Sequence, residues 1–443
     1  MQNQGIRDAR SLGTPKLLVL GLQHMFAMFG ATVLVPALTG LSVSATLLFA
    51  GLGTLFFHFL TKGKVPAFLG SSFAYLAGYA AIAPNGETAL LPYACVGVAA
   101  SGLLYLILAA LVRGFGANRV MRFFPPVVTG PIIICIGMTL ANSAINNCTG
   151  SWDIALVAII TVVVFNIWGK GMLRIIPILL GVLVSYTYAA VTGRVDFSGV
   201  ASAAWIGLPV KMENTVFSLI GNCDVNLLVT AIIAIMPIAF ATMIEHIGDI
   251  CAISSTVGVN FIADPGLHRT LLGDGLATSI ASLFGAPANT TYGENTGVLA
   301  LTRVYDPLVI RLAAVYAIIA SFCPKFAALV SAMPTGTIGG VSLILYGMIS
   351  AIGVRNLVEN RVDLAKSRNV IVVSLIISLA LGITFSTAGA ITFHVGEFTL
   401  NFSGLAVAAI VGIVVNAILP GKDYNFQNDY EYGKTTEDHG QML

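Results

Sequence analysis

Long apolar runs recur along the whole chain, and they limit the fold more than any other feature of the sequence. Stretches such as "NLLVTAIIAIMPIAFATMI" carry no charged residue and do not alternate between apolar and polar positions. A run of about 20 apolar residues spans a bilayer as an α-helix, whereas the strands of a membrane barrel are shorter and alternate. The sequence therefore predicts a helical membrane protein with many spans.

The small share of charged residues agrees with this prediction. Only 9% of the 443 residues are charged, against about 25% in soluble domains. Such a chain cannot cover its surface with groups that water solvates, so we expect its surroundings to be the lipid bilayer. The expected fold class is an all-α polytopic membrane protein.

Fourteen transmembrane spans are predicted from the apolar runs, and the polar-rich loop at 194–225 divides them into seven and seven. They lie near residues 15–38, 44–61, 67–83, 91–112, 125–143, 154–169, 174–193, 226–250, 267–285, 290–302, 308–329, 335–354, 368–387 and 402–420.

The basic residues support this count and give an orientation. Fourteen spans place 19 of the 22 Lys and Arg residues on the side of the two termini. Because cytoplasmic loops carry the excess of basic residues, we expect both termini in the cytoplasm and the chain in the cytoplasmic membrane. Residues 1–14 are expected to form a cytoplasmic segment without a cleaved signal peptide. Residues 421–443 are expected to form a disordered cytoplasmic tail.

Short motifs recur between the two halves. The stretch "LQHMFAMFG" at Leu22 matches "IEHIGDICA" at Ile244, and the same offset of 222 residues carries "GSSFAY" onto "YGENTG". A third pair, which starts at Pro126 and Pro334, is offset by 208 residues. A duplicated unit with an odd number of spans inserts its second copy upside down, so we expect two inverted seven-span repeats.

Spans 3 and 10 are short and are broken by glycine and polar residues in corresponding places of the two halves. They read "PAFLGSSFAYLAG" and "APANTTYGENTG". Unwound backbone at membrane depth is tolerated only where protein buries it or where it lines a cavity, and paired broken segments indicate the binding site of a transporter. Two ordinary kinked helices would explain the glycines but not Glu294.

Ionisable residues are rare within the spans, and such residues are functional candidates because each costs about 2.5–3.5 kcal/mol to insert at the centre of a span. They are His24, His58, Glu245, His246, Asp249, Asp274 and Glu294. We expect His58 and His246 to be structural, and Asp274 could lie near the cytoplasmic end of its span. His24 could hydrogen-bond a carboxylate of span 8.

Glu245 and Asp249 are four residues apart, so they lie on one face of a helix. Two carboxylates this close in a low dielectric should not both be ionised, which makes the pair a candidate proton carrier. The alternative is that Asp249 lies solvated at the cytoplasmic interface.

A carboxylate beside a broken helix selects a particular kind of ligand. An ionised glutamate only accepts hydrogen bonds, so it requires N–H groups on the ligand. The free backbone N–H groups at the start of a half-helix pair with carbonyl oxygens. A planar ring with alternating N–H and C=O groups, such as uracil or xanthine, meets both requirements, and an anion would be repelled.

Signatures of catalysis are absent from the sequence, which has no metal-ligand spacing, nucleophile elbow, phosphate loop or cofactor fingerprint. The six cysteines show no CxxC spacing. We therefore expect no enzymatic activity, no metal, no cofactor and no nucleic-acid partner. The alternative of another class is a membrane enzyme or a channel, and a channel would show a flux far above carrier rates.

Six motifs together resemble the nucleobase–ascorbate transporter family, and among its branches the bacterial uracil permeases. They read "QHMFAMFG", "GSSFAY", "EHIGD", "DPGLHR", "TTYGENTGVLALTR" and "GGVSLILYG". The family signature [Gln/Glu/Pro]-Asn-x-Gly-x4-Thr-[Arg/Lys/Gly] is filled at every fixed position by residues 294–303, "ENTGVLALTR". Uracil members open this signature with glutamate, as here, and xanthine and urate members usually open it with glutamine.

The resemblance implies substrate-binding residues at Phe73, Glu245, Tyr292, Gly293, Glu294 and Tyr346. The two glutamates would accept the ring N–H groups, the backbone amides of Phe73 and Gly293 would hold the carbonyl oxygens, and the two tyrosines would line or close the site. Proton coupling would involve His24, Glu245 and Asp249. Similar uracil permeases can carry histidine where this chain has Asp249, which leaves the details of coupling open.

The resemblance also implies a division into a core and a gate. The core would consist of spans 1–4 and 8–11, in residues 15–112 and 226–329, and the gate of spans 5–7 and 12–14, in residues 125–193 and 335–420. The implied activity is import of uracil by proton symport, with movement of the core against the gate and the proton as the only coupling species.

Two other transport activities and the oligomeric state remain open. One alternative is a purine permease of the same family, for xanthine, urate or guanine. The other is an anion transporter of the related sulfate-permease type, which the carboxylates disfavour. A homodimer is also open, because small-residue motifs serve dimerisation and internal packing equally well.

Overall fold

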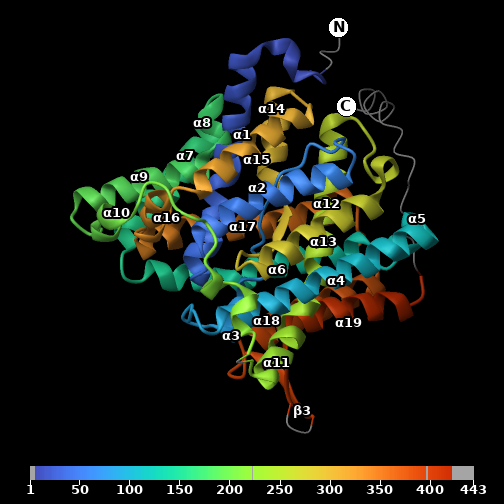
Figure 1. Ribbon diagram of the computed structural model, residues 1–443. Helices are drawn as coiled ribbons and strands as arrows, with labels where there is room; N and C mark the ends of the chain where they lie inside the picture. The colour runs from blue at the N-terminus through green and yellow to red at the C-terminus, as the bar shows by residue number, and fades with distance from the viewer. Residues whose placement is uncertain (1–4, 222, 396–397, 422–443) are drawn as a thin grey trace.

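The computed structural model describes residues 5–221, 223–395 and 398–421, and helices dominate it (Figure 1). Apart from Gly421, the predicted tail at 421–443 lies outside the described residues.

The helices of the first half are α1 (Thr14–Thr39), α2 (Val43–Leu60), α3 (Leu76–Ile82), α4 (Leu91–Phe115), α5 (Ala117–Met121), α6 (Pro126–Cys148), α7 (Trp152–Trp168), α8 (Met172–Ile175), α9 (Pro177–Val191) and α10 (Ser198–Ser202). Those of the second half are α11 (Val225–Ile235), α12 (Ala239–Val257), α13 (Leu267–Leu283), α14 (Gly293–Thr302), α15 (Pro307–Ser321), α16 (Pro324–Ser331), α17 (Thr335–Glu359), α18 (Ser367–Thr384) and α19 (Gly404–Ile418). Four short strands accompany them: β1 (Leu69–Ser71), β2 (Asn289–Thr291), β3 (Ala390–Val395) and β4 (Phe398–Ser403).

Many of these helices suit a bilayer, as the apolar runs predict. Within the described ranges, seven helical segments are long and apolar enough to cross a membrane, or eight if the bent pair α15 and α16 counts as one. Helices α7, α9 and α19 are apolar but shorter, with 17, 15 and 15 residues. The chain is thus a polytopic helical membrane protein, and the count of fourteen spans stays a prediction.

Prolines interrupt three segments that the sequence predicts as single spans. The segment at 226–250 is divided into α11 and α12 by a short 3₁₀ turn that contains Pro237. The segment at 308–329 bends by 88° between α15 and α16, and Pro324 begins α16. The segment at 174–193 is divided before Pro177, which begins α9. Proline lacks the amide proton that continues a helix, so each break falls where the backbone ladder is lost.

The helices pack in two groups. In the first group, α13 packs between α2 and α4, α15 packs on α1 and α2, and α11 packs on α4. In the second group, α17 packs on α6 and α7, α18 pairs with α19 and α6, and α7 pairs with α9. Helix α12 contacts α4 and α13 of the first group and also α6 and α19 of the second, so it lies at their boundary (Figure 1).

The two broken segments, which are more than 200 residues apart in sequence, meet as an antiparallel pair of strands. Leu69 of β1 lies opposite Thr291 of β2, and Gly70 lies opposite Thr290. Two further backbone hydrogen bonds extend the pair, from Ser72 N to Ala288 O at 2.8 Å and from Tyr292 N to Phe68 O at 3.0 Å. All six strand residues are buried. Backbone groups that two broken helices leave unpaired thus satisfy each other away from water.

Gly70 permits this close approach. A Cβ atom at Gly70 would lie 2.5 Å from the ring of Tyr292 and 2.8 Å from Thr32 Oγ1. The hydroxyl of Tyr292 donates to the carbonyl oxygen of Ser71 at 2.8 Å. The tyrosine ring therefore covers the glycine and ties β2 to β1.

Candidate functional site

Helix α14 begins directly after β2, and its first turn carries Glu294. Tyr292 precedes the helix and makes no side-chain capping hydrogen bond, and Gly293 is the first helical residue. The N–H groups at the start of a helix have no partner within it, and their dipoles favour acceptor groups. The break in the predicted span 10 thus places free donors and a carboxylate side by side.

Glu245 lies on α12, which packs against α14. Glu245 and Glu294 thus lie on two helices that contact each other. Oxygen Oε2 of Glu245 is buried and has no hydrogen-bond partner within the described residues. One buried acceptor that lacks a donor among the described residues therefore lies where α12 contacts α14.

Asp249 lies one turn further along α12, and Thr291 of β2 is its partner. The Thr291 hydroxyl donates to Asp249 Oδ2 at 2.9 Å. Because Thr291 itself is buried, this contact holds Asp249 against the broken segment. Asp249 itself is half-buried.

Thr291 also joins Asp249 to a deeper buried pair. Its Oγ1 lies 3.3 Å from His246 Nδ1, and His246 Nδ1 lies 3.5 Å from Asp274 Oδ2. Since the single hydroxyl proton of Thr291 goes to Asp249, its contact with His246 requires the proton on Nδ1. Both oxygens of Asp274 lack a hydrogen-bond partner among the described residues, so His246 and Asp274 lie close together without a hydrogen bond between them.

The expectation for Asp274 needs correction here. Asp274 does not lie near a solvated end of its helix, because the side chains of Asp274 and His246 are both completely buried. His246 is buried and in hydrogen-bond contact with Thr291, which agrees with the structural role expected of it, and its Nδ1 also lies near Asp274. Its ring does turn to a different face from Glu245, as the sequence predicts, but α13 brings a carboxylate to that face.

His24 has its hydrogen-bond partner on α14 and not on α12. The side-chain amide of Asn295 donates to the carbonyl oxygen of His24 at 3.0 Å and lies 3.2 Å from its Nδ1. The expected hydrogen bond between His24 and a span-8 carboxylate does not occur among the described contacts. The reason is the packing of α1 against α14, which places Asn295 next to His24.

An aromatic pair joins the two helix groups beside the site. The rings of Phe73, which follows β1, and Tyr346, on α17, meet edge to face with centroids 6.0 Å apart. Both side chains are buried. Tyr292, by contrast, uses its hydroxyl on Ser71, so only its ring can face a ligand.

Several buried polar atoms around these residues have no hydrogen-bond partner among the described residues. They are Gln23 Oε1, His24 Nε2, Ser72 Oγ, Glu245 Oε2, Asn295 Oδ1, Thr296 Oγ1 and Tyr346 Oη. Each unsatisfied buried group costs about 1–3 kcal/mol, so a cluster of them indicates a place where a polar ligand or water binds. Within the described ranges, no cluster of three or more His, Cys, Asp or Glu side chains is arranged to hold a metal ion.

A cavity of about 410 Å³ leads away from Glu294. One wall comes from α1 and α14, with Ala27 and Gly297, and the other comes from α7 and α8, with Asn166 and Arg174. The cavity thus lies between the two helix groups, and Glu294 is the candidate site residue that lines it, together with the exposed Arg174.

Sequence reasoning missed Thr291 and Asn295, which hold Asp249 and His24. Both flank the predicted site, since Asn295 follows Glu294 and Thr291 ends the strand before it. Their polar character inside a short apolar segment was the available signal, but their partners lie more than 40 and 270 residues away. The assignment of the substrate-binding residues stays a prediction.

Comparison with known proteins agrees with the motifs. A family model described as "Permease family" matches residues 15–389. The uracil permease of Bacillus caldolyticus is 42% identical over 437 residues, which cover 96% of this chain and 96% of that protein. The uracil permease of Bacillus subtilis strain 168 is 40% identical over 451 residues, which cover 99% of this chain and 98% of that protein.

A solved structure supports the fold at a greater distance. The transmembrane domain of the cyanobacterial bicarbonate transporter BicA aligns with 94% of this chain and 100% of that chain, at a TM-score of 0.59 and 12% identity. At this identity the likeness concerns the fold alone. With a family model over most of the chain and relatives at 40% identity or more over nearly all of it, this multi-pass membrane transporter belongs to the permease family, as its resemblance to the nucleobase–ascorbate transporters predicts.

Proposed function

We propose that this chain imports uracil across the cytoplasmic membrane by proton symport. One observation carries the proposal: Glu294 lies in the first turn of α14, α12 with Glu245 packs against this helix, and Glu245 Oε2 is buried without a donor among the described residues. Uracil is neutral and brings N–H donors that only acceptors can satisfy. The names of the two Bacillus relatives support the choice of this pyrimidine.

The uracil ring would be bound by residues that follow β1 and β2 and by Glu245 of α12. Glu245 and Glu294 would accept its N–H groups. The backbone amides of Phe73 and Gly293 would donate to its carbonyl oxygens, and neither amide donates a hydrogen bond among the described contacts. A site built on such hydrogen bonds rejects ligands that lack them, by as much as about 10⁴–10⁵-fold in favourable cases.

Proton coupling would involve Asp249 together with Glu245 and His24. Glu245 and Asp249 lie one helical turn apart, and burial makes two adjacent negative charges costly. Protonation of one of them would remove this repulsion and favour the bound substrate. The chain of contacts from Asp249 through Thr291 and His246 to Asp274 supports a shared proton in this region.

Alternating access would follow from movement of a core, residues 15–112 and 226–329, against a gate, residues 125–193 and 335–420. The separate packing of the two helix groups supports this division, and the pairing of β1 with β2 supports two inverted seven-span repeats in a chain of fourteen spans. Arg174 belongs to a loop that we assign to the cytoplasm. The cavity from Glu294 to Arg174 would then make this an inward-facing state.

Counterflow of radiolabelled uracil tests the site without requiring a gradient. Proteoliposomes loaded with unlabelled uracil should accumulate label with the wild-type chain, and Glu245→Ala and Glu294→Ala should abolish this exchange. Glu213→Ala is a matched control, because its side chain is 73% exposed in a loop. Full exchange in both site variants would overturn the site, and equal competition by xanthine would instead favour a purine permease.

A further inference from the structure

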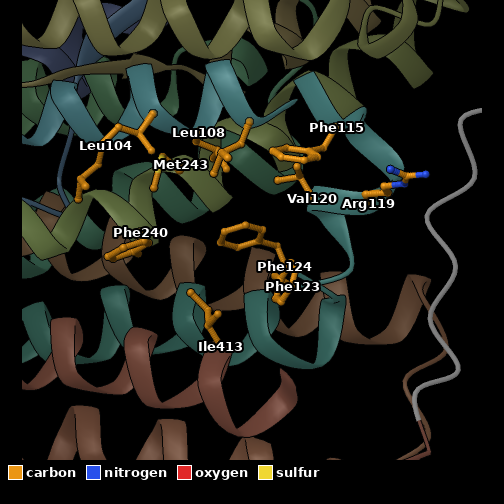
Figure 2. Close-up of a pocket in the computed structure, with 12 residues that line it drawn as sticks. Leu104, Leu108, Phe115, Arg119, Val120, Phe123, Phe124, Phe240, Met243 and Ile413 are labelled. Atoms are coloured by element: carbon orange, nitrogen blue, oxygen red, sulfur yellow. The ribbon is translucent and has the colours of Figure 1, made fainter. Parts of the chain in front are cut away.

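An apolar groove opens on the outer surface of the helix bundle, apart from the candidate site. Its volume is about 500 Å³, within the range of about 300–1,000 Å³ that is usual for small-molecule pockets. One wall is a stripe on α4 formed by Leu104, Leu108, Leu111 and Phe115, whose spacing places them on one helical face. Figure 2 shows α4 facing Phe240 and Met243 of α12, with Ile413 below them.

The groove has a buried floor and an exposed rim. Leu108 is 5% exposed and Met243 is 1% exposed, whereas Ile107 is 55% exposed and Phe115 is 60% exposed. This difference in depth makes a slot that a hydrocarbon chain can enter from the membrane.

A positive charge stands at one end of this apolar slot. Arg119 of α5 is the charged residue among the lining side chains, and Figure 2 shows its guanidinium at the end of the groove, pointing away from the apolar side chains. Residues 113–125, "RGFGANRVMRFFP", contain three arginines and no acidic residue. Among the described residues, no carboxylate forms an ion pair with any of the three.

We propose that this groove binds one acyl chain of an anionic glycerophospholipid, whose phosphate is held by the Arg119 guanidinium. The apolar slot matches the chain, and the planar guanidinium matches the phosphate oxygens. Basic pockets between membrane helices are favourable sites for anionic head groups. The segment outside the structure, residues 422–443, contains no run of aliphatic residues that would fill the slot.

The groove lies where the two helix groups meet. Its walls come from α4 and α12 on one side and from α19 on the other, so a bound chain would contact both helix groups. That a bound acyl chain would contact both the core and the gate rests on the proposed function, which includes movement of the core against the gate. The binding itself does not, and it is measured without transport.

Native mass spectrometry of the purified full-length chain tests the binding, with dioleoyl phosphatidylglycerol compared with dioleoyl phosphatidylcholine as probes. We expect one retained phosphatidylglycerol per chain, with a preference of about fivefold over phosphatidylcholine. Arg119→Gln should remove the preference, and Leu108→Trp should fill the floor and reduce retention of both lipids. The matched controls are Arg10→Gln, at an exposed arginine elsewhere, and Leu103→Trp, at a residue of α4 that is 53% exposed and outside the groove. Both controls should behave as wild type.

A photoreactive diazirine in the acyl chain of the same phosphatidylglycerol gives a second readout. We expect adducts on peptides that contain residues 104–124 and their loss in Leu108→Trp. If Leu108→Trp does not purify as a monodisperse protein, Arg119→Gln carries the test, since it changes an exposed side chain. Either of two results would overturn the site: a lipid preference in Arg119→Gln equal to that of the wild type, or adducts on peptides outside residues 104–124 that persist in Leu108→Trp. The occupant of the groove would then be another copy of the chain or residues 422–443.

Discussion

The hydroxyl of Thr291 donates a hydrogen bond to the Asp249 carboxylate at 2.9 Å, and this contact joins the two elements that build the candidate site. Thr291 ends the strand β2, and Asp249 lies on α12 one turn after Glu245. A change in the charge of Asp249 would therefore act directly on the backbone that precedes Glu294. Substrate binding and protonation would in this way involve the same few residues.

Replacement of Asp249 by asparagine should separate transport from the proton gradient. Asparagine keeps the size of the side chain and an acceptor for Thr291 but does not take up a proton. We expect Asp249→Asn to retain uracil counterflow while gradient-driven uptake falls to the level measured without a gradient. Asp196→Asn, in an exposed loop, should leave both activities unchanged. Gradient-driven accumulation by Asp249→Asn at the wild-type level would exclude Asp249 as the coupling residue.

Removal of the charge from Glu294 or Glu245 should weaken uracil binding. Hydrogen bonds to charged groups contribute about 1.5–3 kcal/mol, so each of Glu294→Gln and Glu245→Gln should lower affinity by roughly 10- to 150-fold. Calorimetric titration of the purified protein with uracil measures this loss, with Glu213→Gln as control. Wild-type affinity in either variant would remove that residue from the site.

Gly70→Ala should destabilise the junction of the two broken segments. The added Cβ would lie 2.5 Å from the Tyr292 ring, and such overpacking typically costs about 1–3 kcal/mol. We expect a lower thermal unfolding temperature and loss of counterflow. Gly382→Ala on α18 is the matched control, since its Cβ would meet no atom within 4 Å, and alanine is favoured over glycine within a helix. Equal unfolding temperatures in the two variants would contradict the tight contact at Gly70.

Cys223 offers a test of the proposed orientation. It is exposed, whereas Cys95, Cys135 and Cys148 are buried, and it belongs to the loop at 194–225 that we assign to the outside. A membrane-impermeant maleimide should label intact spheroplasts, and Cys223→Ser should remove most of the label while Cys323→Ser retains it. Labelling that requires opened membranes would place this loop, and not the termini, in the cytoplasm.

Local features of the fold and of the site could be predicted because they depend on nearby residues. Apolar runs predict the helices, and glycine and polar residues within a short span predict the breaks before α3 and α14. The strands β1 and β2 could not be predicted, since three-residue strands carry little pattern of their own and their pairing depends on contacts across more than 200 residues. Prolines at positions 237 and 324 were visible, but whether a proline bends a span or ends it depends on its neighbours.

The partners within the site were less predictable than its members. Glu245, Asp249 and Glu294 stand out because carboxylates are costly in membrane spans. That His246 meets Asp274, and that Asn295 bonds to His24, follows from how α12, α13, α1 and α14 pack. Spacing along one helix shows which face a residue occupies, but not which helix covers that face.

Uptake of radiolabelled uracil into proteoliposomes, with and without an inward proton gradient and with xanthine as competitor, tests the central claim most directly. Gradient-stimulated uptake that xanthine does not reduce is the predicted result. Uptake that ignores the gradient would contradict proton symport while keeping the uracil site. Absence of uracil uptake, with xanthine transported in its place, would contradict the proposed substrate.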